Sequence, residues 1–338
     1  MRNLDGKRVV VTGGTGSLGM ALVHRLLSGA MGAPQKIIVF SRDEAKQHAM
    51  RVRYLSANQA TDEVIYRNFQ RLLEFRIGDV RDFHSVSSVL ANADVVFHAA
   101  ALKQVPTCEY FPYEAVQTNI GGPENIVRAI RELRLPVETV IGLSTDKACK
   151  PVNVMGMTKA LQERILVRAN LDCPQTRFVC VRYGNVLASR GSVIPLFQEQ
   201  ISSGGPVTIT VPEMTRFLLT LDQAVETVLA AYRTAVAGQI YVPQIPSAAI
   251  RDIVDALIDG RNIPVISTGI RPGEKLHEIL VSEEEVPRTV LRGEYFNIRP
   301  VLPELQDEES DCRPCTAEYS SANHLMTASE IRKLLRAV

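Results

Sequence analysis

The chain has 338 residues, of which 46% are hydrophobic and 22% charged, and its formal net charge is +1 at pH 7. This length allows one large domain or two modest ones, with the composition of an ordinary globular protein. A charge so close to neutral gives no electrostatic support for binding to nucleic acid or an acidic membrane. No apolar run approaches the roughly 20 residues that span a bilayer, so no membrane span is expected.

The N-terminus and the cysteines favour a cytoplasmic protein. Met1-Arg-Asn-Leu-Asp-Gly6 leads directly into an apolar run and does not have the pattern of a signal peptide. The six cysteines lack the spacing of a disulfide framework, as expected in a reducing compartment. Cys312-Arg-Pro-Cys315 is a lone CxxC pair without a second pair or a histidine pair nearby. We therefore predict no metal site, and redox chemistry at this pair remains an alternative.

Apolar runs and helical patterns alternate through the first half of the chain. Strands are predicted at residues 8–12, 36–40, 72–77, 94–98, 139–143 and 178–182. Helices are predicted at residues 17–27, in a charge-rich stretch that ends near residue 57, at 116–133 and at 154–170. This alternation predicts an α/β fold, with a Rossmann-type doubly wound sheet that is mostly parallel and has helices on both faces.

After about Tyr183 the alternation becomes less regular, and Pro and Gly are frequent between elements. Strands are predicted at 207–210 and 239–242, and helices at 193–202, 221–235, 248–258 and 328–336. An acidic segment at 303–315 is expected to be a surface loop. We therefore predict a Rossmann domain over residues 1–183 and a smaller α/β domain over residues 184–338, partly interleaved with the first.

A glycine motif follows the first predicted strand, in Val9-Val-Val-Thr-Gly-Gly-Thr-Gly-Ser-Leu-Gly19. In this position Gly13 permits a tight turn, Gly16 lets the backbone approach a pyrophosphate, and Gly19 lets the helix pack on the strand. The N-terminus of the helix then faces the phosphates. The motif predicts a dinucleotide site, with a turn that binds no ligand as the alternative. The expected contacts are Gly13, Thr15, Gly16, Ser17, Leu18 and Gly19.

The end of the second predicted strand bears on the choice of cofactor. An acid there would bind the ribose 2′-hydroxyl of NAD, whereas an arginine would accept the 2′-phosphate of NADP. Ser41 and Arg42 precede Asp43, so the sequence favours NADP over NAD. Alternatively, Arg42 caps the sheet edge and Asp43 is the N-cap of the next helix. Further cofactor contacts are expected after the third and fourth strands, at Asp79, Val80, Ala99 and Ala101.

Residues 144–159, Ser-Thr-Asp-Lys-Ala-Cys-Lys-Pro-Val-Asn-Val-Met-Gly-Met-Thr-Lys, have the layout of a dehydrogenase active site. The position four residues before Lys159 usually holds a tyrosine, but here it is Met155, which cannot titrate. Asp146 and Lys147 follow the fifth predicted strand, at the sheet edge where ligands bind. We expect proton chemistry at this pair, with a surface charge pair as the alternative. Met155 also suits a helix core.

Several segments together resemble the extended short-chain dehydrogenase/reductase superfamily and, within it, the inverting 4,6-dehydratases of UDP-N-acetylglucosamine. The segments that carry this resemblance are His98-Ala-Ala-Ala-Leu-Lys-Gln-Val-Pro106, Ser144-Thr-Asp-Lys147, Asn153-Val-Met-Gly-Met-Thr-Lys159, Arg182-Tyr-Gly-Asn-Val-Leu-Ala-Ser-Arg-Gly-Ser-Val-Ile-Pro195, Pro212-Glu-Met-Thr-Arg-Phe217 and Arg271-Pro-Gly-Glu-Lys275. The tail, Glu318-Tyr-Ser-Ser-Ala-Asn323, is similar to the capsule and O-antigen type, whose members also carry methionine at the tyrosine position. The chain departs from that type at Pro272, where a histidine is usual.

The resemblance implies an NADP-dependent lyase of surface polysaccharide biosynthesis. The sugar is oxidised at C4, loses water across C5 and C6, and receives the hydride at C6. In this reaction Lys147 would be the base for the C5 proton, Asp146 the acid for the departing hydroxyl, and Lys159 a ligand of the nicotinamide ribose. Thr145 or Ser144 would hold the C4 hydroxyl. The acceptor of the C4 proton stays open between Lys147 and a bound water.

These roles require that Asp146 holds a proton and that Lys147 is neutral for part of the time. Burial is expected to raise the pKa of the carboxyl and to lower the pKa of the amine. Arginine forks suit diphosphate oxygens, and a carboxylate suits ribose hydroxyls. The resemblance therefore implies these contacts with the UDP-sugar: Lys103, Asn185, Arg216, Arg271 and Glu274. For Glu274 a surface salt bridge is the main alternative, and His98 is expected to be a packed strand-end residue.

Two other functions fit the same scaffold. A nucleotide-sugar 4-epimerase would need an acid–base residue at position 155, which Met155 does not supply. A catalytically silent NADP-binding protein would have no use for the Asp146-Lys147 pair or for the substrate segments. The resemblance also implies a homo-oligomer, with a hexamer as the expected size.

Overall fold

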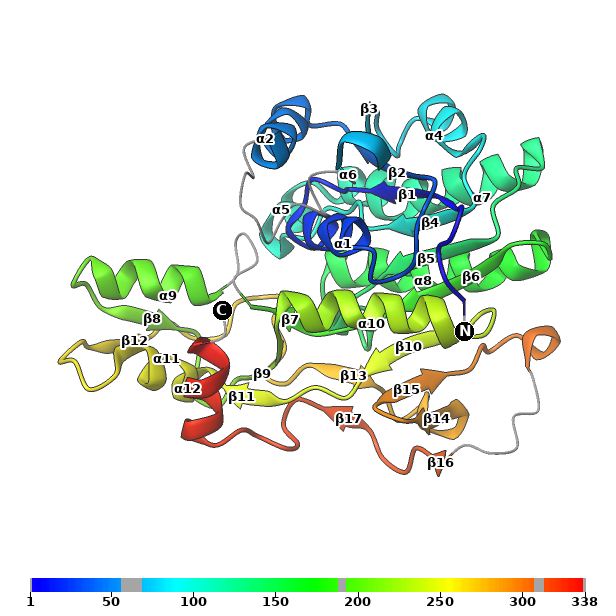
Figure 1. Cartoon of the computed structure of the whole chain (residues 1–338). Coiled ribbons are helices and arrows are strands. Elements are labelled where there is room, and N and C mark those ends of the chain that lie inside the picture. The colour runs from blue at the N-terminus through cyan, green and yellow to red at the C-terminus, as the bar shows by residue number, and fades with distance from the viewer. Residues whose placement is uncertain (1, 56–68, 188–192, 307–312, 337–338) are drawn as a thin grey trace.

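The computed structural model describes residues 2–55, 69–187, 193–306 and 313–336, and a ten-stranded sheet forms its centre (Figure 1). The parallel strands are β1 (Arg8–Thr12), β2 (Lys36–Ser41), β3 (Leu73–Ile77), β4 (Val95–His98), β5 (Thr139–Leu143), β6 (Arg177–Val181) and β10 (Ile240–Pro243). They lie side by side in the order β3-β2-β1-β4-β5-β6-β10. This confirms the Rossmann-type sheet, and the strand order reverses between β1 and β4, where such sheets bind ligands.

The sheet does not end at β6, where the first half was expected to close. Beyond β10 it continues through antiparallel strands, β15 (Tyr295–Ile298), β14 (Thr289–Arg292) and β16 (Arg313–Pro314). The sequence did not indicate these strands because each has only two to four residues and pairs with distant segments. The division into two domains at residue 183 stays a prediction.

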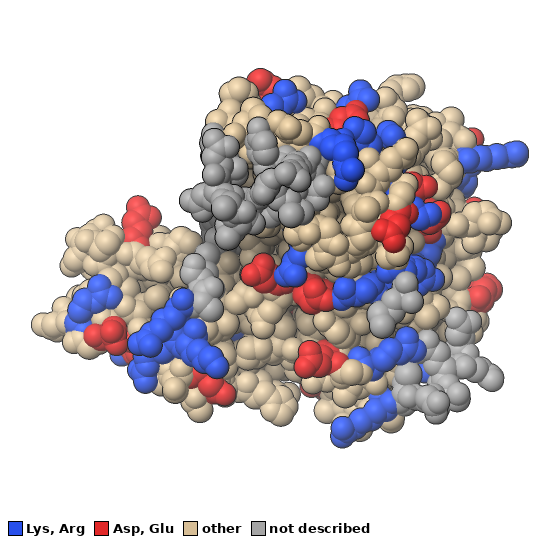
Figure 2. Space-filling view, viewed as in Figure 1, with Lys and Arg blue, Asp and Glu red and all other residues tan. Residues whose placement is uncertain are grey.

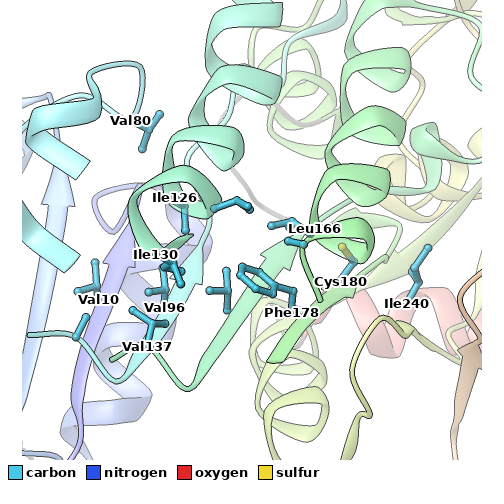
Figure 3. Close-up of a cluster of buried hydrophobic side chains, with 14 of the residues drawn as sticks. Val10, Val80, Val96, Ile126, Ile130, Val137, Leu166, Phe178, Cys180 and Ile240 are labelled. Carbon is cyan, nitrogen blue, oxygen red and sulfur yellow. The ribbon is translucent and has the colours of Figure 1, made fainter. Parts of the chain in front are cut away.

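One face of the sheet packs against helices through a large apolar cluster. The helices are α4 (Phe83–Leu90), α7 (Gly122–Leu133) and α8 (Val154–Asp172). Val10, Val96 and Phe178 of the strands face Ile126 of α7 and Leu166 of α8 (Figure 3). Because both faces of a parallel sheet are covered, its strands are continuous apolar runs rather than alternating ones.

The other face packs against α1 (Ser17–Leu27), α2 (Glu44–Leu55) and α10 (Leu221–Thr234). Val9 and Val11, which flank Val10 in β1, belong to this second cluster together with Leu22 of α1 and Val228 of α10. Successive strand residues point to opposite faces, so one short apolar strand supplies both cores. The two cores fix the carboxyl ends of the strands, where the predicted site residues lie.

A third core lies beside the sheet, in the lobe at the lower left of Figure 1. Its elements are α9 (Val193–Ser202), β8 (Val207–Ile209), α11 (Ile250–Ile258), β12 (Val265–Ser267) and α12 (Ala328–Arg336). Phe197, Ile253 and Ile331 are buried within it. Short strands join this lobe to the large sheet: β7 (Asn185–Val186), β9 (Thr215–Leu219), β11 (Ser247–Ala249), β13 (Ile279–Val281) and β17 (Tyr319–Ser320).

Most predicted elements agree with the structure to within one or two residues, the usual uncertainty of element ends. The helix expected at 116–133 is different, because it is divided into α6 (Pro112–Val116), a π-helical turn (Gln117–Gly121) and α7. The sequence analysis did not predict α4 or α5 (Val105–Tyr110). These helices have eight and six residues, so they show little helical periodicity.

Acidic and basic side chains are interspersed over the face seen in Figure 2, in keeping with the net charge of +1. In the described part of the chain, no helix is both long enough and apolar enough to cross a membrane.

Gly19 allows α1 to pack closely on the loop after β1. A Cβ atom at this position would lie 2.6 Å from Gly14 Cα, which is backbone and cannot rotate away. We predict that Gly19→Ala lowers the free energy of unfolding by about 1–3 kcal/mol, as overpacking does, although alanine favours helices. Chemical denaturation measures this change. As a control, Gly205→Ala should change stability by less than about 0.5 kcal/mol, because nothing lies within 4 Å of its added Cβ. Equal stabilities of the two variants would contradict the prediction.

Candidate active site

A cavity of about 1740 Å³ lies at the carboxyl ends of the parallel strands and extends to the third core. All the predicted cofactor residues line it, and so do all the predicted substrate residues. Among the predicted catalytic residues, Thr145, Lys147, Met155 and Lys159 line it, whereas Asp146 is fully buried behind them. The structure therefore brings residues from both halves of the chain together around one space.

The glycine loop has the backbone geometry that a dinucleotide needs. Gly13 has a φ of +64°, and a Cβ atom there would lie 2.7 Å from Ala100 N. The N-cap of α1 is Gly16, which has no side chain to satisfy the first N–H groups of the helix. Those groups lie at the cavity and are open to a phosphate. The residues present thus fit a dinucleotide, as the motif predicted.

The end of β2 presents a guanidinium to the cavity rather than a free acid. The hydroxyls of Ser41 and Thr15 are 2.9 Å apart, and Arg42, whose side chain is 57% exposed, lies 3.6 Å from Asp79. Asp43 Oδ1 accepts a hydrogen bond from the backbone N–H of Lys46 at 2.9 Å, so this carboxylate caps α2. The N-cap alternative for Asp43 is confirmed.

Asp146 begins a 3₁₀ turn directly after β5, and its surroundings favour the protonated form. Its Oδ1 accepts hydrogen bonds from Thr145 Oγ1 at 2.9 Å and from Lys147 Nζ at 3.0 Å. Its Oδ2 is buried without a partner among the described residues. Burial raises the pKa of Asp146 and outweighs the opposing charge of Lys147. The expected rise in the pKa of Asp146 is confirmed.

Lys147 differs from the expectation. Its Nζ lies 3.0 Å from Asp146 Oδ1, 3.3 Å from Glu278 Oε1 and 3.5 Å from Asn185 Oδ1. Burial alone would lower its pKa, but the charges of Asp146 and Glu278 outweigh burial, so the pKa of Lys147 is raised. The predicted lowering is therefore wrong, because the sequence analysis considered burial and not the combined charges of Asp146 and of Glu278, which it did not place beside this amine.

The two candidate hydroxyls for the sugar differ in their partners. Ser144 Oγ donates to Glu163 Oε1 at 2.5 Å in a buried position. Its proton is therefore committed to the protein interior. Thr145 also lines the cavity, and its hydroxyl is hydrogen-bonded to Asp146. Of the two hydroxyls left open by the sequence, Thr145 is better placed to connect a ligand with Asp146.

Lys159 and Met155 lie on the first turns of α8. Lys159 Nζ donates to Leu143 O at 2.5 Å and to Gln162 Oε1 at 2.6 Å, and burial lowers its pKa to about 8. Met155 lines the cavity and packs against Cys108 in a small apolar cluster. It is therefore both a core residue and a wall of the site. No group that can exchange a proton stands at this position.

The predicted substrate residues line the same cavity. Arg216 is buried and donates to Thr215 O at 2.7 Å. Glu274 Oε2 is buried without a hydrogen-bond partner among the described residues, and Arg271 is exposed beside it in the sequence. Burial lowers the pKa of Lys103. The surface salt bridge considered for Glu274 is not found in the described part of the chain.

A buried ion-pair network lies behind the site, and the sequence analysis gave it no role. Arg182 donates to Glu163 Oε2 at 2.7 Å and to Glu285 Oε2 at 2.7 Å, and all three side chains are almost fully buried. Arg182 also donates to Leu280 O at 2.8 Å. The network joins the end of β6 to α8 and to the segment around β13. The sequence signal was weak: Arg182 directly follows the apolar run 178–181, but both acids lie among other polar residues.

His98 and the CxxC pair were also considered in the sequence. His98 is buried, lies 2.8 Å from Thr12 Oγ1, and has a pKa lowered to about 3 by burial, so it is a packed neutral residue as expected. Cys312 of the CxxC pair lies outside the described residues. Those that are described contain no group of three or more His, Cys, Asp or Glu side chains that could hold a metal ion.

A family described as polysaccharide biosynthesis protein matches residues 9–300. The chain belongs to this family. It is 43% identical over 297 residues to a protein of Rickettsia prowazekii (strain Madrid E) named UDP-glucose 4-epimerase, covering 86% of this chain and 82% of the relative. The Rickettsia conorii protein of the same name is 44% identical over 298 residues, covering 86% and 82%.

Solved structures agree with this assignment. The X-ray structure of Pen from Bacillus thuringiensis superposes with a TM-score of 0.88 and 31% identity, covering 99% of this chain and 98% of that one. DesIV of Streptomyces venezuelae, a dTDP-glucose 4,6-dehydratase solved with NAD, has a TM-score of 0.67 at 20% identity, covering 80% and 86%, and thus shares the fold. The expected extended short-chain dehydrogenase/reductase superfamily is confirmed.

The Arg182 network should dominate the stability of the region behind the site. Arg182→Met removes the cation shared by Glu163 and Glu285, which costs about 3–5 kcal/mol. Among the described residues, Glu285 then keeps only Arg288, at 3.2 Å. Because Arg182 and hydrogen bonding outweigh burial, the pKa of Glu285 is lowered from 4.5 to about 2. This group therefore stabilises the wild type above its unfolded pKa, and the contribution is lost as pH falls toward 2. Denaturation at several pH values should show the deficit of the variant shrinking in acid.

A matched control for this variant is Arg168→Met. Arg168 forms an exposed pair with Asp172 on α8 at 2.7 Å, and such pairs contribute only about 0.3–0.5 kcal/mol. Similar losses for the two variants, or a deficit of Arg182→Met that does not depend on pH, would count against the network.

Proposed function

We propose that this protein is an NADP-dependent UDP-N-acetylglucosamine 4,6-dehydratase of the C5-inverting type, acting in surface polysaccharide biosynthesis. The observation that carries the proposal is the amine of Lys147 at the cavity wall, hydrogen-bonded at 3.0 Å to the carboxyl of Asp146 buried directly behind it. Elimination of water needs an acid and a base together. The family resemblance and the polysaccharide biosynthesis match support the same class of reaction.

The cofactor would be held by the glycine loop, the N-terminus of α1, Lys159 and Arg42. When bound, NADP supplies the hydride acceptor and donor of the reaction. Arg42 is exposed at the cavity and Asp43 is used as a helix cap, which supports a 2′-phosphate over a bare ribose. Lys159 has two acceptors in the protein and a third N–H for a ribose hydroxyl.

The chain's own groups perform the proton transfers. Lys147 first releases its own proton to solvent, and the C4 hydroxyl proton passes to a bound water as the hydride leaves C4. Lys147 then accepts the C5 proton while Asp146 gives its proton to the C6 hydroxyl, which departs as water. C5 regains a proton from solvent on the opposite face as the hydride returns to C6. Thr145 hydrogen-bonds the sugar hydroxyl at C4 and connects it with Asp146. Because Lys147 is charged in the resting protein, its loss of a proton is part of the activation of the site.

The UDP-sugar would lie across the rest of the cavity. Arg216 and Arg271 suit the diphosphate because guanidinium forks bind such oxygens. Glu274, with its partnerless oxygen, suits the hydroxyls of the uridine ribose. Lys103 and Asn185 lie at the cavity wall and would contact the sugar.

A nucleotide-sugar 4-epimerase is the second candidate, because the curated Rickettsia relatives carry the name UDP-glucose 4-epimerase. That reaction inverts C4 through a ketone and returns the hydride to C4, so it needs reversible proton exchange at the C4 oxygen. Met155 provides no such group at this position, and its neighbour Cys108 is fully buried. This favours elimination.

The reaction is tested with purified protein, NADP and UDP-N-acetylglucosamine. We predict a product lighter than the substrate by one water in the mass spectrum, and a kcat lowered by about 10²–10⁴ in Lys147→Met and Asp146→Asn, as for lost general acid–base groups. Calorimetric affinity for UDP should be kept. Lys150→Met is the matched control, because Lys150 is an exposed lysine paired with Glu318. A product of unchanged mass but altered C4 configuration would replace the dehydratase by the epimerase.

The cofactor preference is tested at Arg42. The chain contains no tryptophan, so binding is followed by the fluorescence of the reduced cofactor. We predict that Arg42→Ala weakens NADPH binding about tenfold, since a hydrogen bond to a charged group contributes about 1.5–3 kcal/mol, while NADH binding hardly changes. Equal loss for both cofactors, or tighter NADH binding by the wild type, would reject NADP as the preferred cofactor.

A further inference from the structure

Lys147 lies between two buried carboxylates, not one. Its Nζ is 3.0 Å from Asp146 Oδ1 and 3.3 Å from Glu278 Oε1, and the two acidic side chains are 1% and 3% exposed. Neither the sequence motifs nor the reaction proposed above gives Glu278 a role. Its position beside the catalytic amine nevertheless makes it part of the same charge balance.

The charges in this cluster determine where a proton resides. Burial disfavours the ionised form of each carboxyl, so the proton is held by the one with fewer cations beside it. Glu278 has two further cations nearby, Lys275 at 3.6 Å and Arg216 at 4.0 Å. Asp146 has only Lys147 within ion-pair distance among the described residues, and its other bond comes from the neutral hydroxyl of Thr145. The proton is therefore better held on Asp146.

Glu278 is also held rigidly in place. Its backbone N–H donates to Ser321 Oγ at 2.9 Å, and Ser321 N–H donates back to Glu278 O at 2.8 Å. Ser321 is fully buried and follows β17, which pairs with β13 just after Glu278. The C-terminal tail thus fixes the backbone that carries this carboxylate.

We propose that Glu278 is the counter-ion of Lys147, and that it leaves Asp146 as the carboxyl that holds a proton. Glu278 is a positioning residue, since it acts through Lys147 and Asp146; its meaning for catalysis rests on the dehydratase function proposed above. The ionisable groups that face Lys147 are Asp146, Glu278 and, as a like charge, Arg216.

The directions of the pKa shifts agree with this division. Burial raises the pKa of Asp146, and the nearby charge of Glu278 raises it further. For Glu278 burial acts in the same upward direction, but Lys147, Arg216 and Lys275 outweigh it, so its pKa is lowered. One carboxyl of the pair is thus shifted toward the acid form and the other toward the ionised form.

The proposal is tested by infrared titration of the purified protein, in difference spectra between wild type and variants. We expect the carbonyl band of a protonated buried carboxyl to persist well above pH 4, where an ordinary aspartic acid with a pKa of about 3.9 has ionised. Asp146→Asn should remove this band. In Glu278→Gln the band should disappear at lower pH than in the wild type, because Asp146 loses a like charge and becomes the only acidic partner of Lys147 among the described residues.

Two further variants separate charge from structure. Glu278→Asp keeps the negative charge, so its carboxyl band should titrate closer to that of the wild type than the band of Glu278→Gln does. The aspartate variant also replaces the glutamine variant in the test if the latter does not fold. Glu199→Gln removes an exposed carboxylate elsewhere on the cavity wall and should leave the band unchanged. Thermal unfolding and NADPH binding check that each variant is folded.

The outcomes distinguish this inference from the proposed reaction. A band that survives Asp146→Asn but is lost in Glu278→Gln would place the proton on Glu278 and overturn the proposal, as would an unchanged titration in both Glu278 variants. Infrared titration needs no turnover. If the infrared bands behave as expected but the mass assay shows no dehydrated product, the proposed reaction is rejected and the role of Glu278 as counter-ion is retained. A dehydrated product together with a carboxyl titration that is the same in the wild type and the Glu278 variants would reject only the role of Glu278 as counter-ion.

Discussion

The buried pairing of Arg182 with Glu163 and Glu285 is the constraint on which the architecture of the site depends. A guanidinium can be buried at the end of a central strand only if carboxylates balance it with good geometry, and here both bonds are 2.7 Å. The same arginine donates to Leu280 O, two residues beyond Glu278. One interaction therefore fixes α8, with its lysine, and the late segment that completes the charge cluster. Glu163 of the same network also accepts the hydrogen bond of the Ser144 hydroxyl.

Elements with a strong local signal were predictable from the sequence. The bounds of β1, α1 and β5 agree with the prediction to the residue, because an apolar run or a glycine motif defines each of them. The strands β14–β16 were not predictable, since two to four residues show no period and their partners are set by tertiary contacts. The same limit applies to the site. The neighbours of Asp146 along the chain were known from the sequence, but Glu278 comes from a distant segment that no spacing rule connects with β5.

The error in the predicted pKa of Lys147 has this origin. Burial alone lowers the pKa of an amine, and the prediction used burial. Carboxylates at 3.0 Å and 3.3 Å, those of Asp146 and Glu278, together reverse the sign, since the attraction of opposite charges grows as solvent is excluded. Charge balance in a buried cluster is therefore a property of all its members. The roles of Asp146 and Lys147 become clear only when Glu278, Arg216 and Lys275 are considered with them.

The methionine at position 155 acquires a meaning from the same geometry. Met155 itself cannot exchange a proton, whereas Thr145 and Lys147 both donate hydrogen bonds to one oxygen, Asp146 Oδ1. The carbons that change in a 4,6-dehydration, C4, C5 and C6, are consecutive. One connected group of hydroxyl, carboxyl and amine can therefore serve all of them from one side. A 4-epimerase would concentrate its proton exchange at the C4 oxygen, where position 155 of α8 usually supplies a tyrosine. Methionine in place of this tyrosine is therefore easier to reconcile with elimination than with epimerisation.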